Sequence, residues 1–145
     1  MTRVYKSSDL EQAAKLLVDT FIQEPWKEEW TVELAKTRIE EFMSGPMSIG
    51  YVYEENKEII GVMCGRQSTY LCGKEYFIDE FFISPSQQGK GIGTKMINYA
   101  KNDLQQQGFV NMVLNTEKEY PSETFYKKNN FKIKESLIFM YLDFD

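Results

Sequence analysis

The chain has 145 residues, of which 42% are hydrophobic and 27% charged, with a formal net charge of −5 at pH 7. This length suits a single compact domain over residues 1–145, and the composition is that of a globular protein rather than a disordered or membrane protein. Because nucleic-acid binding needs a basic surface, the negative charge argues against that class of partner.

The first thirty residues lack the apolar core of a secretory signal, and no segment has membrane-spanning length, so we expect a cytoplasmic protein without membrane contact. The two cysteines, Cys64 and Cys72, could pair with each other, but without an export signal we expect them to be reduced and packed in the core. The chain has no histidine, which removes most zinc sites and every Ser-His or Cys-His nucleophile. We therefore expect no bound metal, and catalysis would depend on carboxylates, tyrosine or backbone groups.

The first half of the chain alternates between helical and extended patterns. A short strand is predicted over residues 3–5, followed by amphipathic helices over residues 10–21 and 31–42, with "EPW" between them. Alternating residues then predict strands over 49–53 and 59–67, joined by a turn at residues 55–57, and a third strand over 75–84.

In the second half, the apolar period changes near Gln88 and predicts a helix that stops at Gly108. A strand over 110–114, a short helix over 121–129, a left-handed Asn130 and two closing strands over 131–134 and 137–142 follow. The order β-α-α-β-β-β-α-β-α-β-β predicts an α+β fold, with one mixed, mostly antiparallel sheet flanked by helices.

A glycine-rich loop, "QQGKGIG", stands between a strand that ends at Pro85 and the next helix. Glycines at this place let backbone N–H groups approach an anion, and the helix N-terminus favours negative charge. The dinucleotide fingerprint fails because Thr94 stands where its third glycine would be, and the Walker loop fails because Gly91 follows Lys90. The alternative is that the glycines only form a tight turn.

The spacing Gln88-x-x-Gly91-x-Gly93, with the preceding apolar strand and Pro85 and with "FYKKNNF" downstream, resembles the GNAT superfamily of acyl-CoA-dependent N-acetyltransferases. The order of elements is similar to that fold along the whole chain. The resemblance implies acetyl-CoA as a co-substrate, with the pantetheine arm bound by the backbone of the strand and the pyrophosphate bound by the loop. The residues implied are Phe82, Ile83 and Ser84 in the strand, and Gln88, Gly89, Lys90, Gly91, Ile92, Gly93 and Thr94 in the loop.

Two departures from the family pattern lie downstream. Asn130 replaces the usual glycine before the final phenylalanine, and Glu119 stands where an asparagine often contacts the cofactor. Asn115 is the candidate substitute for that contact.

Adjacent carboxylates, Asp79 and Glu80, interrupt an apolar strand. An amine is an ammonium near neutral pH and must lose a proton before it attacks a thioester, and a nearby carboxylate can bind it and accept that proton. Strand alternation predicts that the two side chains point to opposite faces, unless a bulge changes this. The alternative role for either carboxylate is to pair with a lysine or to cap backbone amides.

The stretch "IDEFF" followed by "SQQGKGIGTK" resembles the aminoglycoside 6′-N-acetyltransferase branch, which implies Asp79 as the base, with Glu80 second. The wider resemblance to the GNAT superfamily implies Tyr126, in "FYKKNNF", as the general acid, against the alternative that Tyr126 packs its helix against the sheet. A backbone amide near Phe82 or Ile83 would stabilise the oxyanion.

In the family the acceptor enters over the first two helices, where this chain has the acidic, aromatic segment "FIQEPWKEEWTVE". Glu24, Trp26 and Trp30 are the candidate contacts to a cationic amine, against the alternative of a solvated face with two core tryptophans. The predicted activity is direct acetyl transfer, in a ternary complex, to a primary amine of a small cationic acceptor such as an aminoglycoside.

Alternatives are a polyamine, peptide or amino-acid N-acetyltransferase, a non-catalytic sensor of acyl-CoA, and a nucleotide-binding enzyme. The apolar C-terminal segment "SLIFMYLDF" also predicts a homodimer formed through a free sheet edge.

Overall fold

The computed structural model describes residues 1–144, and the chain divides into two compact units, residues 1–115 and residues 116 onward. The first unit contains the strands and most of the helices, and the second contains one short helix. The elements are β1 (Thr2–Val4), α1 (Leu10–Phe21), α2 (Val32–Met43), β2 (Ser48–Glu55), β3 (Glu58–Tyr70), β4 (Gly73–Ile83), α3 (Ile92–Gln106), β5 (Phe109–Leu114) and α4 (Pro121–Lys128).

The sheet has the spatial order β1-β2-β3-β4-β5. Neighbouring strands are antiparallel except for the parallel pair β4 and β5. The β2–β3 hairpin turns through Asn56 and Lys57, both with positive φ (52° and 65°), as expected for a two-residue turn that matches strand twist. The predicted mixed, mostly antiparallel sheet of an α+β fold is confirmed.

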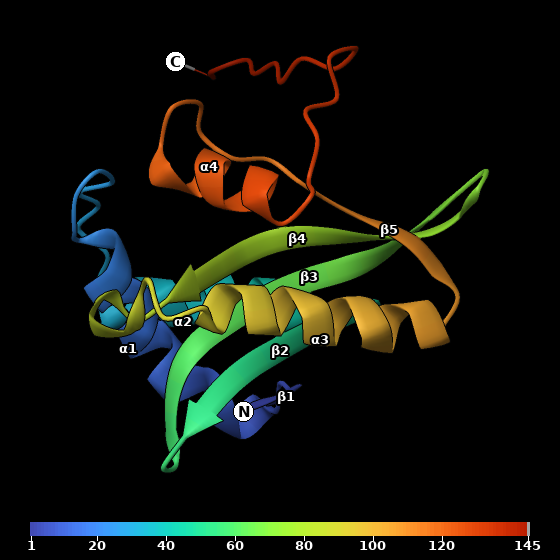
Figure 1. Cartoon of the computed structure of the whole chain (residues 1–145). Helices are drawn as coiled ribbons and strands as arrows, with labels where there is room; N and C mark the ends of the chain where they lie inside the picture. The colour runs from blue at the N-terminus through green and yellow to red at the C-terminus, as the bar shows by residue number, and fades with distance from the viewer. Residues whose placement is uncertain (145) are drawn as a thin grey trace. The chain divides into compact units, whose positions relative to one another are not determined.

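Helices cover both faces of this sheet, with α1 and α2 on one face and α3 on the other (Figure 1). The α1/α2 face buries apolar side chains of both helices against β2, β3 and β4: Ala13, Ala14, Leu16, Leu17, Ala35, Ile39, Val52, Ile59, Val62, Cys64 and Phe82. On the opposite face, the Tyr51 hydroxyl donates a 2.7 Å hydrogen bond to Asp103 of α3, and the Tyr51 and Tyr76 rings lie edge to face. These contacts place Phe82 of β4 on the α1/α2 face and Tyr76 of β4 on the α3 face.

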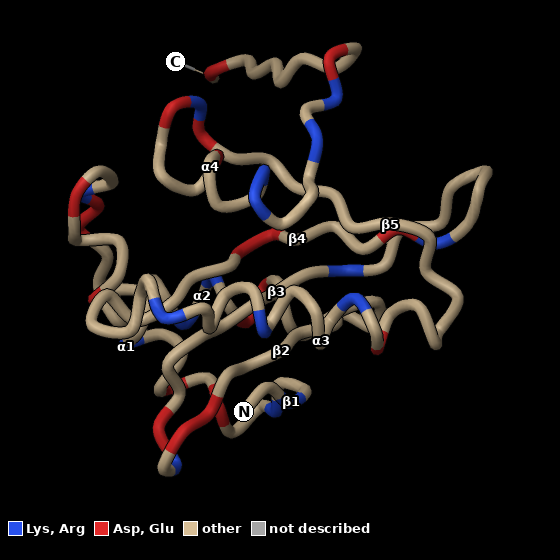
Figure 2. Tube along the Cα trace, in the orientation of Figure 1, with Lys and Arg blue, Asp and Glu red and all other residues tan. Residues whose placement is uncertain are grey.

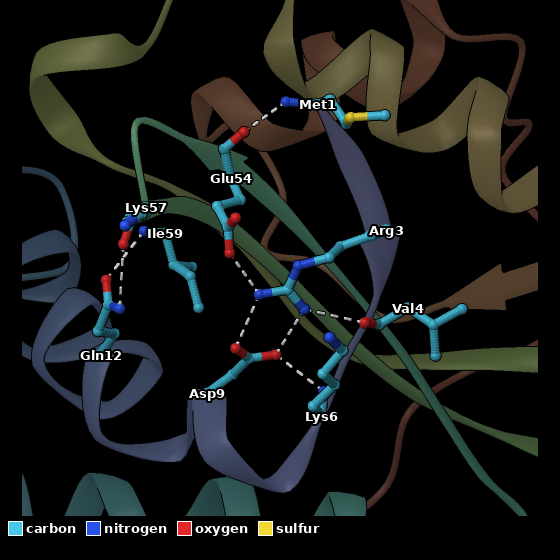
Figure 3. Close-up of polar contacts among 9 residues, drawn as sticks. All are labelled: Met1, Arg3, Val4, Lys6, Asp9, Gln12, Glu54, Lys57 and Ile59. Atoms are coloured by element: carbon cyan, nitrogen blue, oxygen red, sulfur yellow. Dashed lines mark hydrogen bonds and ion pairs between the residues drawn. The ribbon is translucent and has the colours of Figure 1, made fainter.

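A cluster of charged groups ties the N-terminus to the sheet (Figure 3). The Arg3 guanidinium donates to both carboxylate oxygens of Asp9 at 2.9 Å and to Glu54 of β2 at 2.6 Å. The backbone N–H of Lys6 also donates to Asp9 at 2.8 Å. The cluster therefore joins β1, β2 and the segment that leads into α1.

The two predicted closing strands are wrong. Among the described residues from 129 to 144, none is in a strand. A strand requires a neighbour that pairs its N–H and C=O groups, and the described part of the second unit offers a helix and no strand. The apolar side chains of residues 137–142 are therefore exposed, from 69% at Leu137 to 82% at Leu142.

Both cysteines are free, as expected, but only Cys64 is buried. Cys72 is exposed in the turn between β3 and β4, so its predicted core position is wrong. No helix in the described part of the chain has the length and apolarity needed to cross a membrane.

Candidate active site

A β-bulge in β4 determines where the two carboxylates point. Cys64 of β3 lies opposite Glu80, and the next residue, Gly65, lies opposite Ile78. Asp79 is thus the extra residue of the bulged strand. Side-chain alternation along β4 shifts at this point, because an extra residue changes which positions face each side of the sheet.

Asp79 and Glu80 consequently face the same side of the sheet, which corrects the prediction of opposite faces. Cys64 and Arg66 are two residues apart on β3 and share the α1/α2 face. Glu80 lies opposite Cys64, and Asp79 bonds to Arg66. The bulge therefore brings two adjacent carboxylates to one face, which regular alternation forbids.

Arg66 pairs with Asp79. Its Nε donates to Oδ2 of Asp79 at 3.2 Å, and its guanidinium lies 4.7 Å from the centre of the Phe77 ring. The Asp79 side chain is only 7% exposed, whereas that of Arg66 is 52% exposed. The carboxylate is therefore largely covered while its cationic partner reaches solvent.

Arg38 of α2 pairs with Glu80. Its Nε donates to Oε2 of Glu80 at 2.7 Å, and its guanidinium lies over the rings of Trp30 and Phe42, at 5.5 and 4.8 Å from their centres. Burial raises the pKa of Glu80 above its ordinary value, and the hydrogen bond from Arg38 only partly opposes this. Glu80 is thus held in place and is easier to protonate than a solvated glutamate.

Neither arginine was predicted as a partner of the carboxylates. The predicted partners were a lysine or backbone amides, whereas the observed partners are arginines from other elements, α2 and β3. The available signal was that the chain has three arginines, of which Arg38 lies in a predicted amphipathic helix and Arg66 in a predicted strand. The buried thiol of Cys64 is no substitute nucleophile, since burial and the two nearby carboxylates raise its pKa.

The glycine loop precedes α3. Gly89 and Gly91 have positive φ, 79° and 80°, and a Cβ built at either position meets nothing within 4 Å. Gly91 is the residue before the helix, and the first helical hydrogen bond there is from the N–H of Lys95 to Gly91. The N–H groups of the first turn, Ile92 to Thr94, therefore have no helical acceptor. Gly93 is buried in that turn, and Thr94 and Lys90 are exposed.

The end of β4 separates from β5 just beside this loop. The parallel pairing stops at Ile78 and Leu114, so residues 79–83 have no strand neighbour on that side within the described chain. The Gln88 side chain donates to the carbonyl of Ile83 at 3.0 Å, which ties the loop to the strand end. Phe82 is buried in the core, Ser84 donates its N–H to Ile60, and Asn115 follows β5 as an exposed residue.

The predicted acceptor residues lie in the segment between α1 and α2. The Trp30 indole donates to Glu28 at 2.9 Å, and the Trp26 ring packs edge to face on Phe21, whose ring contacts Phe82. Glu24 is exposed and pairs with Lys27 at 2.9 Å. Trp30 therefore lies beside the Arg38–Glu80 pair, whereas Glu24 has its own cationic partner.

Tyr126 belongs to the second unit, on α4. Its ring lies edge to face with those of Phe125 and Phe131, and its carbonyl accepts the N–H of Phe131. Asn130 has a φ of 69°, so its predicted left-handed conformation is confirmed. Asn130 can stand where the family has glycine because asparagine tolerates this conformation better than most residues.

Solved structures share this architecture. A possible acetyltransferase from Clostridium difficile 630 matches with a TM-score of 0.83 and 18% identity, covering 100% of this chain and 98% of that chain. AAC(6′)-Iy in complex with a bisubstrate analogue, CoA-S-monomethyl-acetylneamine, matches with a TM-score of 0.75 and 17% identity, covering 99% of this chain and 97% of that chain. Glucosamine-6-phosphate N-acetyltransferase from Arabidopsis thaliana matches with a TM-score of 0.71 and 23% identity, covering 100% of this chain and 98% of that chain. At these identities the similarity shows the fold.

Sequence comparison identifies the family. No curated protein matches the chain, but the sequence model of the acetyltransferase (GNAT) family matches residues 10–131, which is most of the chain. The chain therefore belongs to the GNAT family of acetyltransferases, and it is an acyltransferase of a family that uses acetyl-CoA.

Proposed function

We propose that this protein transfers the acetyl group of acetyl-CoA to a primary amine of a small acceptor, by direct attack in a ternary complex. The observation that carries the proposal is the bulge at Asp79, which presents Asp79 and Glu80 on one face where β4 leaves β5. An amine acceptor needs a proton acceptor at this kind of position, and the chain has no histidine for that task.

The glycine loop fits the pyrophosphate of CoA. Gly89 and Gly91 leave open space where a side chain would otherwise stand, and the first turn of α3 offers backbone N–H groups without helical acceptors. These features suit a doubly charged anion. Residues Gln88 to Thr94 would bind the pyrophosphate, the backbone of Phe82 to Ser84 would bind the pantetheine arm, and Asn115 is the further candidate contact.

Asp79 is the proposed base. Its carboxylate takes one proton from the acceptor ammonium, and the freed nitrogen attacks the acetyl carbon, forming the C–N bond as the C–S bond breaks. The nitrogen then loses its second proton and the departing thiolate gains one, so the products are the amide, CoA thiol and one proton released to solvent.

Other groups complete this reaction. Glu80, fixed by Arg38, helps to position the ammonium and is the second candidate base. A backbone N–H near Phe82 or Ile83 would stabilise the charge that develops on the acetyl oxygen. Tyr126, by the family resemblance, is the proposed proton donor to the thiolate.

Several classes of amine are candidate acceptors. Two of the solved structures of this fold carry names that point to different acceptors, an aminoglycoside derivative and an amino sugar phosphate. Candidates are therefore a small cationic amine such as an aminoglycoside, a polyamine, and a peptide or amino acid, with Glu24, Trp26 and Trp30 as proposed contacts. A sensor that binds acyl-CoA without turnover is the non-catalytic alternative.

The test is release of CoA thiol from acetyl-CoA by the purified protein, scanned over aminoglycosides, polyamines, amino acids and short peptides. We expect release with one class and a loss of roughly 100-fold or more in kcat for Asp79→Asn, with unchanged acetyl-CoA affinity. Glu75→Gln is the matched control, because Glu75 lies on the same strand and bonds to Asn111. Tight acetyl-CoA binding without release on any acceptor would support the sensor and overturn the proposal.

A further inference from the structure

Two arginines flank the candidate catalytic carboxylates. Arg38 contacts Glu80 from α2, and Arg66 contacts Asp79 from β3, both on the α1/α2 face of the sheet. We infer that the acceptor carries an acidic group, a carboxylate or a phosphate, in addition to its amine, and that Arg66 binds this group. The inference rests on the proposed acetyl transfer and narrows its acceptor class.

The charges around the carboxylates favour a zwitterion over a polycation. Asp79 and Glu80 are each matched by an arginine, so this pair of ion pairs has no net charge. A polycation gains most from an excess of negative charge, which is absent from these four side chains. An acceptor with one positive and one negative group adds no net charge to these four side chains.

The acidic segment between α1 and α2 adds one carboxylate close to these ion pairs: Glu28 accepts a hydrogen bond from the Trp30 indole and is among the groups that raise the pKa of Glu80. Glu24 pairs with Lys27, and Lys36 pairs with both Glu11 and Glu33. Figure 2 shows acidic and basic residues intermixed in the loop after α1. Of the acids in this segment, Glu24 and Glu33 have ion-pair partners, and one of its cations, Arg38, lies on Glu80 itself.

Arg66 has the geometry of an anion-binding group. It uses Nε for Asp79, and no described residue accepts a hydrogen bond from its two terminal nitrogens. Those nitrogens form a planar fork that matches a carboxylate or phosphate with two parallel hydrogen bonds. The Phe77 ring supports the guanidinium at 4.7 Å, and half of the side chain is open to solvent.

Arg38 is the less suitable of the two. It lies over two aromatic rings, Trp30 and Phe42, and its bond to Glu80 is short at 2.7 Å. Its packing makes it a fixed support for Glu80. Arg66, with a longer bond of 3.2 Å and greater exposure, is free to meet a ligand.

The amine and the acidic group of one acceptor would then be bound side by side. No residue of the described chain donates a hydrogen bond to Oδ1 of Asp79, so in the proposed complex this oxygen accepts a hydrogen bond from the acceptor ammonium, beside a side chain that is 7% exposed in the free protein. The acidic group would bind the terminal nitrogens of Arg66, whose Nε stays on Oδ2. The ammonium is thereby directed to the carboxylate that takes its proton.

The experiment compares acceptors that differ only in the acidic group. β-Alanine, 4-aminobutyrate and 6-aminohexanoate are measured against alkylamines of the same chain length, and glucosamine 6-phosphate against glucosamine. The readout is kcat/KM for CoA thiol release. We expect the acidic member of at least one pair to be preferred by roughly 10- to 100-fold, the size of a charge-assisted hydrogen-bond pair. The two series separate a carboxylate from a phosphate.

The Arg66→Gln variant tests the residue. We expect the preference for the acidic member to fall to near unity, mainly through a raised KM for that member, and Arg66→Lys to restore part of it. The ratio within a pair is the readout because any effect on Asp79 changes both members alike. Lys74→Gln is the matched control, since Lys74 also lies over an aromatic ring, that of Phe109, but at the other end of β4.

The possible outcomes separate the two proposals. This inference is overturned if the two members of every pair release CoA thiol at equal rates. It is also overturned if Arg66→Gln keeps the preference for the acidic member. Either result leaves the proposed acetyl transfer standing. A strong preference for aminoglycosides or polyamines also overturns it. No release with any acceptor overturns the proposed function and this inference with it. The comparison of acceptors uses the unaltered protein, so it tests the preference for an acidic acceptor even if a variant fails to fold.

Discussion

The guanidinium of Arg38 donates its Nε to Oε2 of Glu80 at 2.7 Å, joining α2 to the bulged strand β4 across 42 residues of sequence. This bond satisfies a carboxylate whose side chain is only 14% exposed. Burial nevertheless raises the pKa of Glu80, so the folded state binds a proton more readily than the unfolded chain does.

This linkage predicts a pH-dependent effect of Glu80→Gln. Between the ordinary glutamate pKa and the raised pKa of the folded state, the native protein holds more protons, so its free energy of unfolding falls as pH rises. Glutamine does not titrate. The stability of the variant relative to the wild type should therefore increase through that window and become constant above it.

Urea denaturation at pH values from about 4 to about 8 measures this difference. Glu75→Gln, on the same strand, is the control. A difference between Glu80→Gln and wild type that is constant over the whole range would contradict the account.

Asp9 should show the opposite dependence. Burial alone would raise its pKa, but hydrogen bonds from Arg3 and from the Lys6 backbone lower it. Its stabilising effect is thus present above the ordinary aspartate pKa and is lost as pH falls through the lowered one. Asp9→Asn should lower the free energy of unfolding by about 2–3 kcal/mol at neutral pH and flatten the acid side of the stability profile.

Glu54→Gln is the matched control, because Glu54 pairs with the same Arg3 but is more exposed. We expect Glu54→Gln to lower the free energy of unfolding by less than about 1 kcal/mol. Equal decreases in the free energy of unfolding of Asp9→Asn and Glu54→Gln would contradict the prediction that the buried Asp9 contributes more to stability than Glu54.

Gly91→Ala tests the phosphate-binding loop. Because Gly91 has a φ of 80°, alanine should destabilise the protein by about 1–2 kcal/mol through backbone strain. We also expect weaker acetyl-CoA binding, since a Cβ would stand in the open space beside the first turn of α3. Calorimetric titration and thermal unfolding measure the two effects separately. Gly45→Ala, outside this loop and without a positive φ, is the control, and unchanged acetyl-CoA affinity in Gly91→Ala would reject the loop's role.

Tyr126→Phe tests the proposed proton donor. Removal of the hydroxyl should lower kcat by roughly 10-fold or more and leave the dissociation constant of acetyl-CoA unchanged. Tyr141→Phe, an exposed tyrosine of the same unit, should have no effect. If kcat is the same in both variants, Tyr126 has only a packing role.

The C-terminal segment gives a prediction about assembly. Its apolar residues, with Ile138 and Phe139 at 80% and 79% exposure, form a patch of a kind that monomers rarely leave uncovered. In the described sheet β5 pairs only with β4 and is therefore an edge strand, which is the kind of strand that a second copy can extend.

We therefore predict a dimer that depends on this segment. Light scattering after size-exclusion chromatography should show twice the chain mass for the wild type and the chain mass for Ile138→Glu. A monomeric wild type would reject the prediction. Val110→Glu, at an exposed apolar position on β5, is a second variant that tests the edge itself.

Local patterns predicted most of the elements. Helical spacing in residues 10–21 and the glycine at 108 placed α1 and the end of α3 close to their observed bounds. The strands β2 to β4 were predicted because alternation and turn residues are both local signals. The two C-terminal strands failed, since a high strand propensity over residues 137–142 does not supply the neighbour that a strand needs.

The site was less predictable than the fold. The two carboxylates and the glycine loop stand out in sequence because charge in an apolar strand and glycine before a helix are unusual. The bulge at Asp79 depends on the register of β4 against β3, and the pairing of Arg38 with Glu80 joins residues that are far apart in the chain. Such tertiary relationships leave no local pattern, so the shared face of the carboxylates and their arginine partners emerged only in the structure.

The central claim is that Asp79 removes a proton from an acceptor amine beside bound acetyl-CoA. The most direct test is mass-spectrometric detection of the N-acetylated acceptor after incubation with acetyl-CoA, for wild type and Asp79→Asn, with acetyl-CoA affinity measured for both. The account predicts an acetylated amine with the wild type and a loss of roughly 100-fold in its rate for the variant at equal affinity. Equal rates of acetylation in the two proteins would contradict it.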